Sequence, residues 1–334
     1  MKALEGAGLE HLYGLSPVLN ALVANRREFT QPPPNNVMDW DNDNDDDNDD
    51  NDDGYQQQQQ QQYEQSPQRK PQAQFSPWLF VQEQKGSGGG RGRGRGGGRS
   101  YDKVQQAERI QELAQERGIP IAHVDKGVLN TLSGNRPHQG VVLRCGKLDF
   151  TPLSRVPLPG GTGNDGLLEV TPNLWLVLDE VVDPQNLGAL LRSAFFLGGL
   201  DTIGVLVCER NSSPLSPTVS AASAGALELL NVYSTTNLPR TLAAAEEDGF
   251  RIVGASSTIK DLDIPVYDLT DLPSSKEPTL LLLGSEGHGL RHLVAKSCTA
   301  FVRIPGAGDI QGVDSLNVSV TGAIILHELL RQSR

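Results

Sequence analysis

The second half of the sequence combines short apolar runs with amphipathic helical patterns. Apolar runs lie at 174–178, 203–207, 251–255, 280–283 and 301–304, and helical patterns are interspersed between and after them. Strands connected by helices form a parallel sheet with helices on both faces, because each crossover must return the chain to the same end of the sheet. We therefore predict an α/β fold for this half of the chain.

The last strand of this pattern leads into a loop with little side-chain cover. The run Phe301 to Ile304 ends at Pro305, and glycines stand at Gly306, Gly308 and Gly312 before a helical pattern that starts at Ser315. Glycines allow main-chain N–H and C=O groups to approach a ligand closely, and Ser315 with Asn317 places polar groups at the helix entrance. The residues alone fit an ordinary strand–turn–helix with a serine cap equally well.

Two further stretches have the same strand–loop character. Leu280 to Leu290 reads LLLLGSEGHGL, with one carboxylate, Glu286, in a glycine-bracketed turn. Leu174 to Gly199 is a strand, a turn through Asp183 and Pro184, and then a helix that carries Asn186 and Arg192. In this order, the three stretches resemble the motifs of the SpoU-type (TrmH-like) RNA ribose 2′-O-methyltransferases of the SPOUT superfamily. The resemblance covers the last half of the chain and is to the rRNA guanosine subgroup, which includes fungal mitochondrial members.

This resemblance has implications for the fold and the partners. It implies a SPOUT methyltransferase domain at 172–334, whose parallel sheet is tied into a trefoil knot, and a homodimer. It also implies a small α/β RNA-binding domain, similar to a ribosomal-protein fold, at 1–150, with 151–171 as a Pro/Gly-rich linker. Ribosomal RNA is the expected partner and S-adenosyl-L-methionine the expected cofactor, with no membrane and no metal involved.

The resemblance also assigns roles to particular side chains. Its catalytic residues carry over to Asn186, Arg192, Glu286, Ser315 and Asn317. Its cofactor-binding positions carry over to Leu283, Gly284, Gly287, Ile304, Gly312, Leu316 and Asn317. Arginine holds its proton tenaciously, so we favour binding of a phosphate and stabilisation of the developing alkoxide by Arg192, and a general-base role stays open. Ser285 and Ala221 depart from the family pattern, where Asn and a basic residue are usual.

The first half of the sequence predicts the elements of the small domain. Leu12 to Arg27 has helical spacing, with Ser16 as its cap and Pro17 at the first helical position. Further along, we predict a strand in 75–82, a helix at 101–117, a strand at 119–124, a helix at 126–132 and a strand at 141–145. The turn before the last strand contains Arg136, His138 and Gln139, which match a family motif expected to contact RNA; a turn satisfied by its own polar side chains is the alternative.

Two low-complexity inserts interrupt this half, at about 31–74 and 85–100. The first contains an Asp/Asn run and seven consecutive glutamines from Gln56 to Gln62, and the second reads RGRGRGGGR. Both lack the apolar residues needed to offset chain entropy, so we expect disorder. The RGG-like tract can hold single-stranded RNA, although drift in a low-complexity insert accounts for it as well.

The formal net charge of −12 is a local property of one insert. Ten of the 41 acidic residues lie between Asp39 and Asp53, which leaves 31 against 29 basic residues elsewhere. The acidity therefore does not exclude a nucleic-acid partner. The three cysteines, Cys145, Cys208 and Cys298, lack the spacing of a zinc site or a disulfide framework.

The N-terminus does not have the Arg-rich, acid-poor character of an organelle leader. The residues alone indicate the cytosol, the nucleus or a missing leader, whereas the resemblance implies the mitochondrion. Two functional alternatives remain at this stage: a tRNA 2′-O-methyltransferase, and a non-catalytic RNA-binding or ribosome-assembly protein. The joint presence of Asn186, Arg192, Glu286, Ser315 and Asn317 argues against the second.

Overall fold

A computed structural model describes residues 8–29, 78–83, 97–160, 171–256, 263–307 and 315–332, without the side chains of 97–100. Within these residues the chain forms two sheets, one of four strands and one of eight. Most of the two predicted inserts and the predicted cofactor residue Gly312 lie outside the described residues.

The smaller sheet is built from the first half of the chain. Its strands are ordered β1-β4-β2-β3; β4 is antiparallel to β1 and β2, and β2 is parallel to β3. Helices α2 and α3 cover one face around a core that includes Leu12, Leu79 and Leu143, and α4 covers part of the other face. The elements are β1 (Leu9–Tyr13), α2 (Leu15–Ala24), β2 (Trp78–Gln82), α3 (Gly97–Glu116), β3 (Ile121–Val124), α4 (Lys126–Leu132) and β4 (Val141–Gly146).

The structure corrects the predicted start of this region. Leu12 and Tyr13 belong to β1, an edge strand that sequence reasoning merged with the following helix. Ser16 lies inside α2 and is not its cap, because the helix begins at Leu15 after Gly14. Oε1 of Gln139 instead accepts a hydrogen bond from the backbone N–H of Leu15, at 2.9 Å.

The larger sheet is parallel at every described strand pair and has the order β10-β12-β9-β11-β6-β7-β8-β5. Its strands are β5 (Thr151–Pro152), β6 (Leu174–Leu178), β7 (Ile203–Cys208), β8 (Val232–Thr235), β9 (Arg251–Ala255), β10 (Val266–Asp268), β11 (Thr279–Leu283) and β12 (Ala300–Arg303). Its helices are α5 (Pro184–Gly198), α6 (Pro217–Ala222), α7 (Ala226–Leu229), α8 (Leu238–Glu247), α9 (His292–Ala295) and α10 (Val318–Gln332), with a 3₁₀ turn at Leu269–Asp271.

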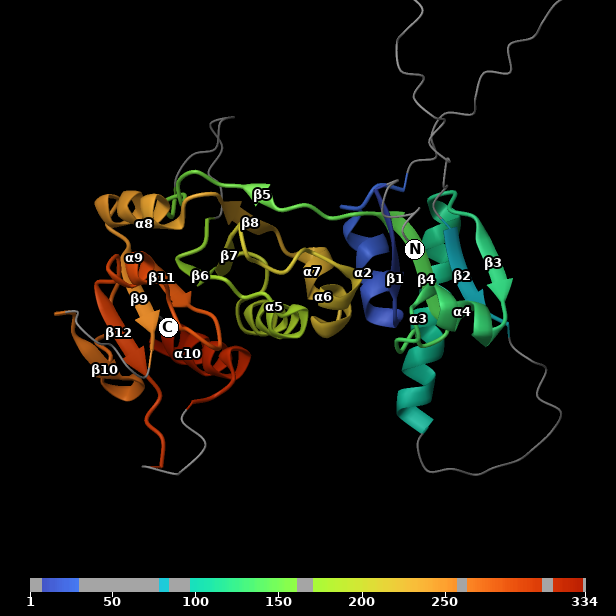
Figure 1. The fold of residues 1–334 in the computed structure, drawn as a ribbon. Helices are drawn as coiled ribbons and strands as arrows, with labels where there is room; N and C mark the ends of the chain where they lie inside the picture. The colour runs from blue at the N-terminus through green and yellow to red at the C-terminus, as the bar shows by residue number, and fades with distance from the viewer. Residues whose placement is uncertain are drawn as a thin grey trace, which may run out of the picture.

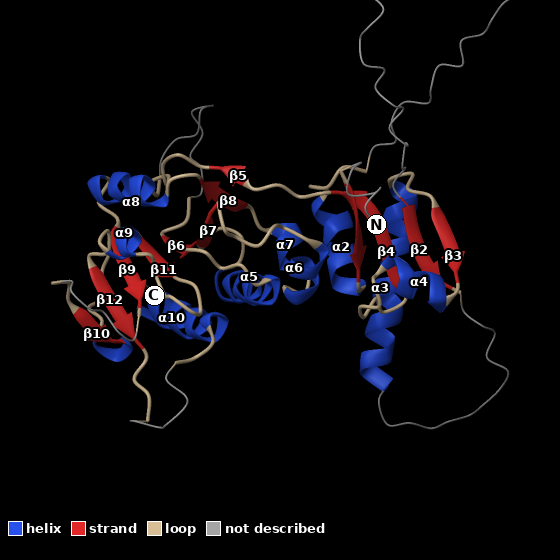
Figure 2. Cartoon of the chain, in the orientation of Figure 1, coloured by secondary structure: helices blue, strands red, loops and turns tan. Residues whose placement is uncertain are grey.

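Helices cover both faces of the larger sheet, as the alternating pattern predicts (Figures 1 and 2). α5 and α10 pack together on one face over a core that contains Leu176 and Leu281, and α8 and α9 pack on the other over Trp175. Thr151–Pro152, predicted to open the linker, forms β5 and extends the sheet beside β8. No helix in the described residues is long and apolar enough to cross a membrane.

The two sheets are joined by a buried charged contact. Arg27, which follows α2 and is 3% exposed, donates from Nε and Nη2 to both carboxylate oxygens of Glu228 in α7, at 2.6 and 2.8 Å. Its Nη1 donates to Glu10 in β1 and to the carbonyl of Gly146, and Ser220 donates to Glu228 at 2.6 Å. A two-point guanidinium–carboxylate contact of this kind fixes orientation as well as distance.

Burial makes the loss of either charged partner of this contact costly in free energy. Burial alone would lower the pKa of Arg27, but the hydrogen bonds and charges of Glu228 and Glu10 raise it, so the guanidinium stays charged. Glu228 is 1% exposed and therefore depends on the same partners for solvation. Removing Arg27 leaves Glu228 buried without its two-point partner, and removing Glu228 leaves Arg27 with Glu10 as its remaining carboxylate partner. Breaking a buried pair in this way costs far more than an exposed ion pair contributes.

Glu228→Ala is expected to lower the free energy of unfolding by about 3–5 kcal/mol, because Arg27 loses its two-point partner inside the protein. Urea denaturation followed by circular dichroism measures the change. Glu112→Ala is the matched control, because Glu112 pairs with Arg109 at 3.0 Å on the solvent-facing side of α3 and its loss should leave the midpoint unchanged. Equal effects of the two substitutions would show that the buried contact does not hold the domains together.

Candidate active site

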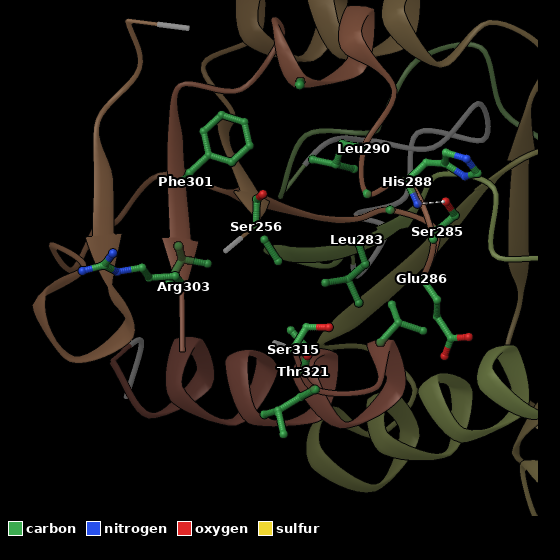
Figure 3. Close-up of a pocket in the computed structure, with 18 of the residues that line it drawn as sticks. Ser256, Leu283, Ser285, Glu286, His288, Leu290, Phe301, Arg303, Ser315 and Thr321 are labelled. Carbon is green, nitrogen blue, oxygen red and sulfur yellow. Dashed lines mark hydrogen bonds between the residues drawn. The ribbon is translucent and has the colours of Figure 1, made fainter. Parts of the chain in front are cut away.

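A pocket of about 690 Å³ lies where the carboxyl ends of β9, β11 and β12 meet the start of α10. Figure 3 shows side chains from these elements around one space, with Arg303 extending away from its centre. Because parallel strands all end at the same edge, loops far apart in the sequence meet there. The lining residues are Ala255, Ser256, 283–290, His292, Ala295, Phe301–Ile304, Ser315–Val318 and Thr321.

The loop after β11 folds tightly back on itself. Ser285 and Gly289 exchange backbone hydrogen bonds of 3.1 and 2.9 Å, and the Ser285 hydroxyl accepts one from the N–H of His288. A Cβ at Gly284 would lie 2.1 Å from the carbonyl carbon of Gly289, so a side chain at this position is sterically impossible without moving the loop. The close approach explains why a glycine stands here.

A buried carboxylate anchors the far end of the same loop. Asp179, fully buried at the end of β6, accepts hydrogen bonds from the backbone N–H and the Nε of Arg291, at 3.0 and 2.8 Å. The hydrogen bond to Asp179 raises the pKa of Arg291. The backbone N–H of Asp179 also donates to the carbonyl of Leu283, so the loop between Leu283 and Arg291 is held at both ends by β6.

Three of the predicted catalytic residues form one hydrogen-bonded group. Oε1 of Glu286 accepts a hydrogen bond from Nδ2 of Asn186 and another from Nδ2 of Asn317, each 2.7 Å long. Nδ2 of Asn317 also donates to Oδ1 of Asn186 at 3.0 Å, and Oδ1 of Asn317 accepts from the backbone N–H of Ser319 as the cap of α10. The contacts join residues from α5, the β11 loop and α10, which are 31 to 131 positions apart.

The other predicted catalytic and cofactor-binding residues lie partly at the pocket and partly outside it. Ser315 and Leu316 are exposed and line the pocket together with Leu283, Gly284, Gly287 and Ile304. Asn186 is buried and is not the cap of α5, because the side chain of Asp183 accepts the hydrogen bond from the N–H of Gln185. Arg192 is exposed outside the pocket, and no hydrogen bond or ion pair links it to any described residue.

Sequence reasoning missed several lining residues, above all Ser256 at the end of β9 and Phe301 in β12. Their strands were predicted, so the rule that parallel strands end at one edge could have found them. His288 and His292 are exposed and also line the pocket. Among the described residues there is no group of three potential metal ligands.

The predicted RNA-contacting turn of the small domain divides into two kinds of residue. The ring of buried His138 lies 3.1 Å from Oδ1 of Asn130 and accepts from the N–H of Gly140, and Gln139 holds the start of α2. His138 thus contributes to satisfying the turn and Gln139 ties the turn to α2, and the contact of both residues with RNA stays a prediction. Arg136 is exposed, with its guanidinium 5.8 Å from the ring centre of Tyr13, and its contact with RNA stays a prediction.

Two family models match the sequence. The model described as "SpoU rRNA Methylase family" matches residues 173–327, and the one described as "RNA 2'-O ribose methyltransferase substrate binding" matches residues 100–151. A Schizosaccharomyces pombe protein named "rRNA methyltransferase 1, mitochondrial" is 36% identical over 231 residues, which are 64% of this chain and 75% of the relative. The chain belongs to the SpoU rRNA methylase family. The family prediction made from the three motifs is thereby confirmed.

A second relative is matched over a smaller share of its own length. A Dictyostelium discoideum protein of the same name is 34% identical over 64% of this chain, but the match spans only 42% of that longer protein. Among solved structures, the "AdoMet bound rRNA methyltransferase from Sinorhizobium meliloti" has a TM-score of 0.60 and 18% identity, with 98% of this chain and 88% of that chain covered. At this identity the likeness shows the fold, and it confirms the SPOUT-type domain preceded by a small α/β domain.

Gly284→Ala is expected to lower the melting temperature and to displace the loop that carries Glu286, because the new Cβ overlaps the backbone of Gly289. Overpacking in such a site typically costs about 1–3 kcal/mol. Differential scanning calorimetry measures the shift, with Gly306→Ala as the control because nothing lies within 4 Å of a Cβ there. An unchanged melting temperature for Gly284→Ala would mean that the loop does not pack as described.

Proposed function

We propose that the protein is an S-adenosyl-L-methionine-dependent methyltransferase that modifies a ribose 2′-hydroxyl, of a guanosine, in mitochondrial large-subunit rRNA. The observation that carries the proposal is the hydrogen-bonded group of Asn186, Glu286 and Asn317 beside the pocket. Family membership and the mitochondrial names of the two relatives support the RNA class and the location. The solved Sinorhizobium meliloti rRNA methyltransferase has this cofactor bound.

The pocket has features that suit this cofactor. Gly284 and the loop that it starts offer main-chain groups, and Leu283, Ile304 and Leu316 offer apolar surface for an adenine ring. Leu316 is 48% exposed at the mouth of the pocket, so its side chain is available for a ligand to cover. When bound, the cofactor supplies a methyl group on a positively charged sulfur.

Glu286 and the two asparagines orient the substrate in this proposal. Both amides donate to Oε1 of Glu286, while among the described residues no hydrogen bond reaches its Oε2. We assign Oε2 to a ribose hydroxyl of the RNA, held in line with the methyl group. Correct positioning is a large part of catalysis for such a weak nucleophile, because it removes the cost of bringing two partners into line.

Arg192 has a separate role, which its exposed position makes possible. A guanidinium stays charged at neutral pH and can bind a phosphate while it stabilises the negative charge that develops on the 2′ oxygen. Asn186, Glu286, Asn317 and Ser315 lie at the pocket, whereas Arg192 lies outside it. In this proposal, Arg192 therefore reaches the RNA that is bound at the pocket of a second copy of the chain.

We propose a homodimer formed through the outer surface of α5 and α10. These packed helices expose Phe196, Val320 and Ile324, and Phe196 is 85% exposed. Arg192 precedes Phe196 by one helical turn and therefore lies on the same side of α5. A dimer that covers this surface places Arg192 at the interface.

Phe196→Glu is expected to convert the dimer to a monomer, because a charge replaces the most exposed aromatic side chain of the proposed interface. Sedimentation velocity at micromolar concentration measures the mass. Tyr101→Glu in α3 is the matched control, because Tyr101 is also an exposed aromatic residue, at 64%, and lies on the other domain. A monomeric wild-type protein would refute the proposed dimer.

Arg192→Ala is expected to slow methyl transfer by about 100-fold or more, since it removes one donor to the developing charge. Single-turnover methylation of an rRNA fragment with labelled cofactor gives the rate, and calorimetry should show S-adenosyl-L-methionine binding nearly unchanged. Arg192→Lys should also be slow, because it lacks the planar two-point contact. Arg240→Ala, at an exposed arginine in α8 on the opposite face, is the control. Wild-type turnover of Arg192→Ala would end the assignment, and the absence of methylation by the wild type would end the proposed function.

A further inference from the structure

One face of the smaller sheet carries a cluster of planar side chains that the active site does not use. Strand alternation sends Leu12, Leu79 and Leu143 to the core beneath α2 and α3. The intervening residues point to the opposite face. They are His11 in β1, Trp78 and Phe80 in β2, and Arg144 in β4.

Strand register places these side chains next to one another. His11 pairs with Arg144 across β1 and β4, and Arg144 pairs with Trp78 across β4 and β2, so the three form a row across the sheet. Directly paired residues in adjacent antiparallel strands lie about 5 Å apart. Phe80 follows Trp78 on the same face of β2, since it is two residues further along the strand.

The side chains in this cluster stack on one another. The rings of Trp78 and Phe80 have centres 6.2 Å apart and planes inclined by 21°. The guanidinium carbon of Arg144 lies 5.3 Å from the Phe80 ring centre, and Nε of Arg144 donates to Nε2 of His11 at 3.2 Å. His11 meets the edge of Phe80 at 6.3 Å. The result is a compact cluster of planar groups with one positive charge, in which the Trp78 and Phe80 rings stack and the His11 ring stands perpendicular to that of Phe80.

The cluster reaches solvent through Trp78, whereas His11, Phe80 and Arg144 are half-buried. Helix α4 covers the neighbouring row of this face through Leu129, which packs on Tyr13 and Val142 with Phe80 against them. Trp78 lies one row further along and is 36% exposed. The solvent-facing side of an antiparallel sheet is usually polar, so a tryptophan stacked on a phenylalanine there is unusual.

The charge state of the cluster favours a nucleic acid over a purely apolar partner. Burial and the neighbouring charge of Arg144 lower the pKa of His11 to about 4, so its ring is neutral at physiological pH and leaves Arg144 as the charge of the cluster. Arg136, beside Tyr13, adds a second guanidinium. Aromatic faces beside guanidinium groups are the surface on which unpaired RNA bases stack while their phosphates are neutralised.

We propose that Trp78, Phe80, Arg144 and His11 form a platform on which an unpaired base of the RNA substrate stacks. This inference rests on the proposed function, because it takes RNA as the substrate. It adds that the small domain recognises a single-stranded segment, since the bases of an A-form duplex stack on one another and present no free face. Of these residues, only Arg144 lies inside the segment that matches the substrate-binding family model, at 100–151.

The test measures binding of a short single-stranded RNA and of the duplex of the same sequence to the full chain. Trp78→Ala should weaken single-strand binding about ten-fold or more, because a base loses its stacking partner. Trp78→Phe should keep most of the wild-type affinity. Arg144→Lys keeps the charge but loses the planar group, so it should bind as weakly as Arg144→Ala. Val128→Ala, at an exposed aliphatic residue of α4, is the control that should change nothing.

Two further readouts distinguish base stacking from phosphate attraction and from a role in the chemical step. In Trp78→Ala the slope of log affinity against log salt concentration should stay at the wild-type value, because no phosphate contact is lost. In the same variant, the rate of methyl transfer at saturating RNA should also equal that of the wild type. If the wild type binds RNA without methylating it, the proposed function is refuted and the platform is not.

Equal single-strand affinity of Trp78→Ala and the wild type would overturn the platform and leave the exposed rings as a protein-docking surface. Melting curves identify any variant that fails to fold, and for such a variant the comparison of Arg144→Lys with Arg144→Ala decides. A duplex affinity that falls as much as the single-strand affinity would overturn the platform as well.

Discussion

The parallel direction of the larger sheet is the constraint on which the rest of the molecule depends. All of its strands end at one edge, so residues as distant in sequence as Ser256 and Leu316 line one pocket. Position alone does not fix side chains, however. The carboxylate of Glu286 ties α5 to α10, and Asp179 ties the loop that carries Glu286 back to β6. The edge of the sheet thus becomes a site because two carboxylates, the buried Asp179 and the exposed Glu286, hold its loops in place.

A third carboxylate joins the two halves of the chain. Glu228 is surrounded by Arg27 and Ser220, and Arg26 beside it donates to the carbonyl groups of Leu227 and Glu228 at the end of α7. A contact that buries charge is stable only while every partner is present. Glycine contributes too, since a Cβ at Gly225 would lie 2.7 Å from the carbonyl oxygen of Ser16, so α2 and α7 approach at backbone distance.

Sequence reasoning succeeded where the signal was local. Continuous apolar runs identified β6, β7 and β11, and the bounds of α4 were predicted without error because Asp125 caps a short helix that ends before a glycine-containing turn. It failed where tertiary contacts decide. Leu12 and Tyr13 suit a helix by spacing, but pairing with β4 makes them a strand. Short strands such as β8 and β10 have little apolar signal of their own, and they form because a neighbouring strand offers free hydrogen-bonding groups.

The candidate site shows the same division. Glu286 stands out in the sequence as one carboxylate among glycines, and the resemblance of three motifs grouped it with Asn186 and Asn317, which the structure joins by hydrogen bonds. No sequence signal relates Arg27 to Glu228 across 201 positions, because that pairing exists only once both sheets have formed. The exposure of Arg192 could not be predicted from the sequence either. Its neighbour on the helix is Phe196, an aromatic residue that would be expected in the core but faces solvent.

The joint made by Arg27 also sets a length. A domain on a loose tether samples many separations from the catalytic pocket, whereas one held through a two-point buried contact keeps a single separation. In the proposed function, the small domain therefore holds its part of the RNA at one fixed distance from the pocket. The position of the modified ribose along the RNA then follows from this distance.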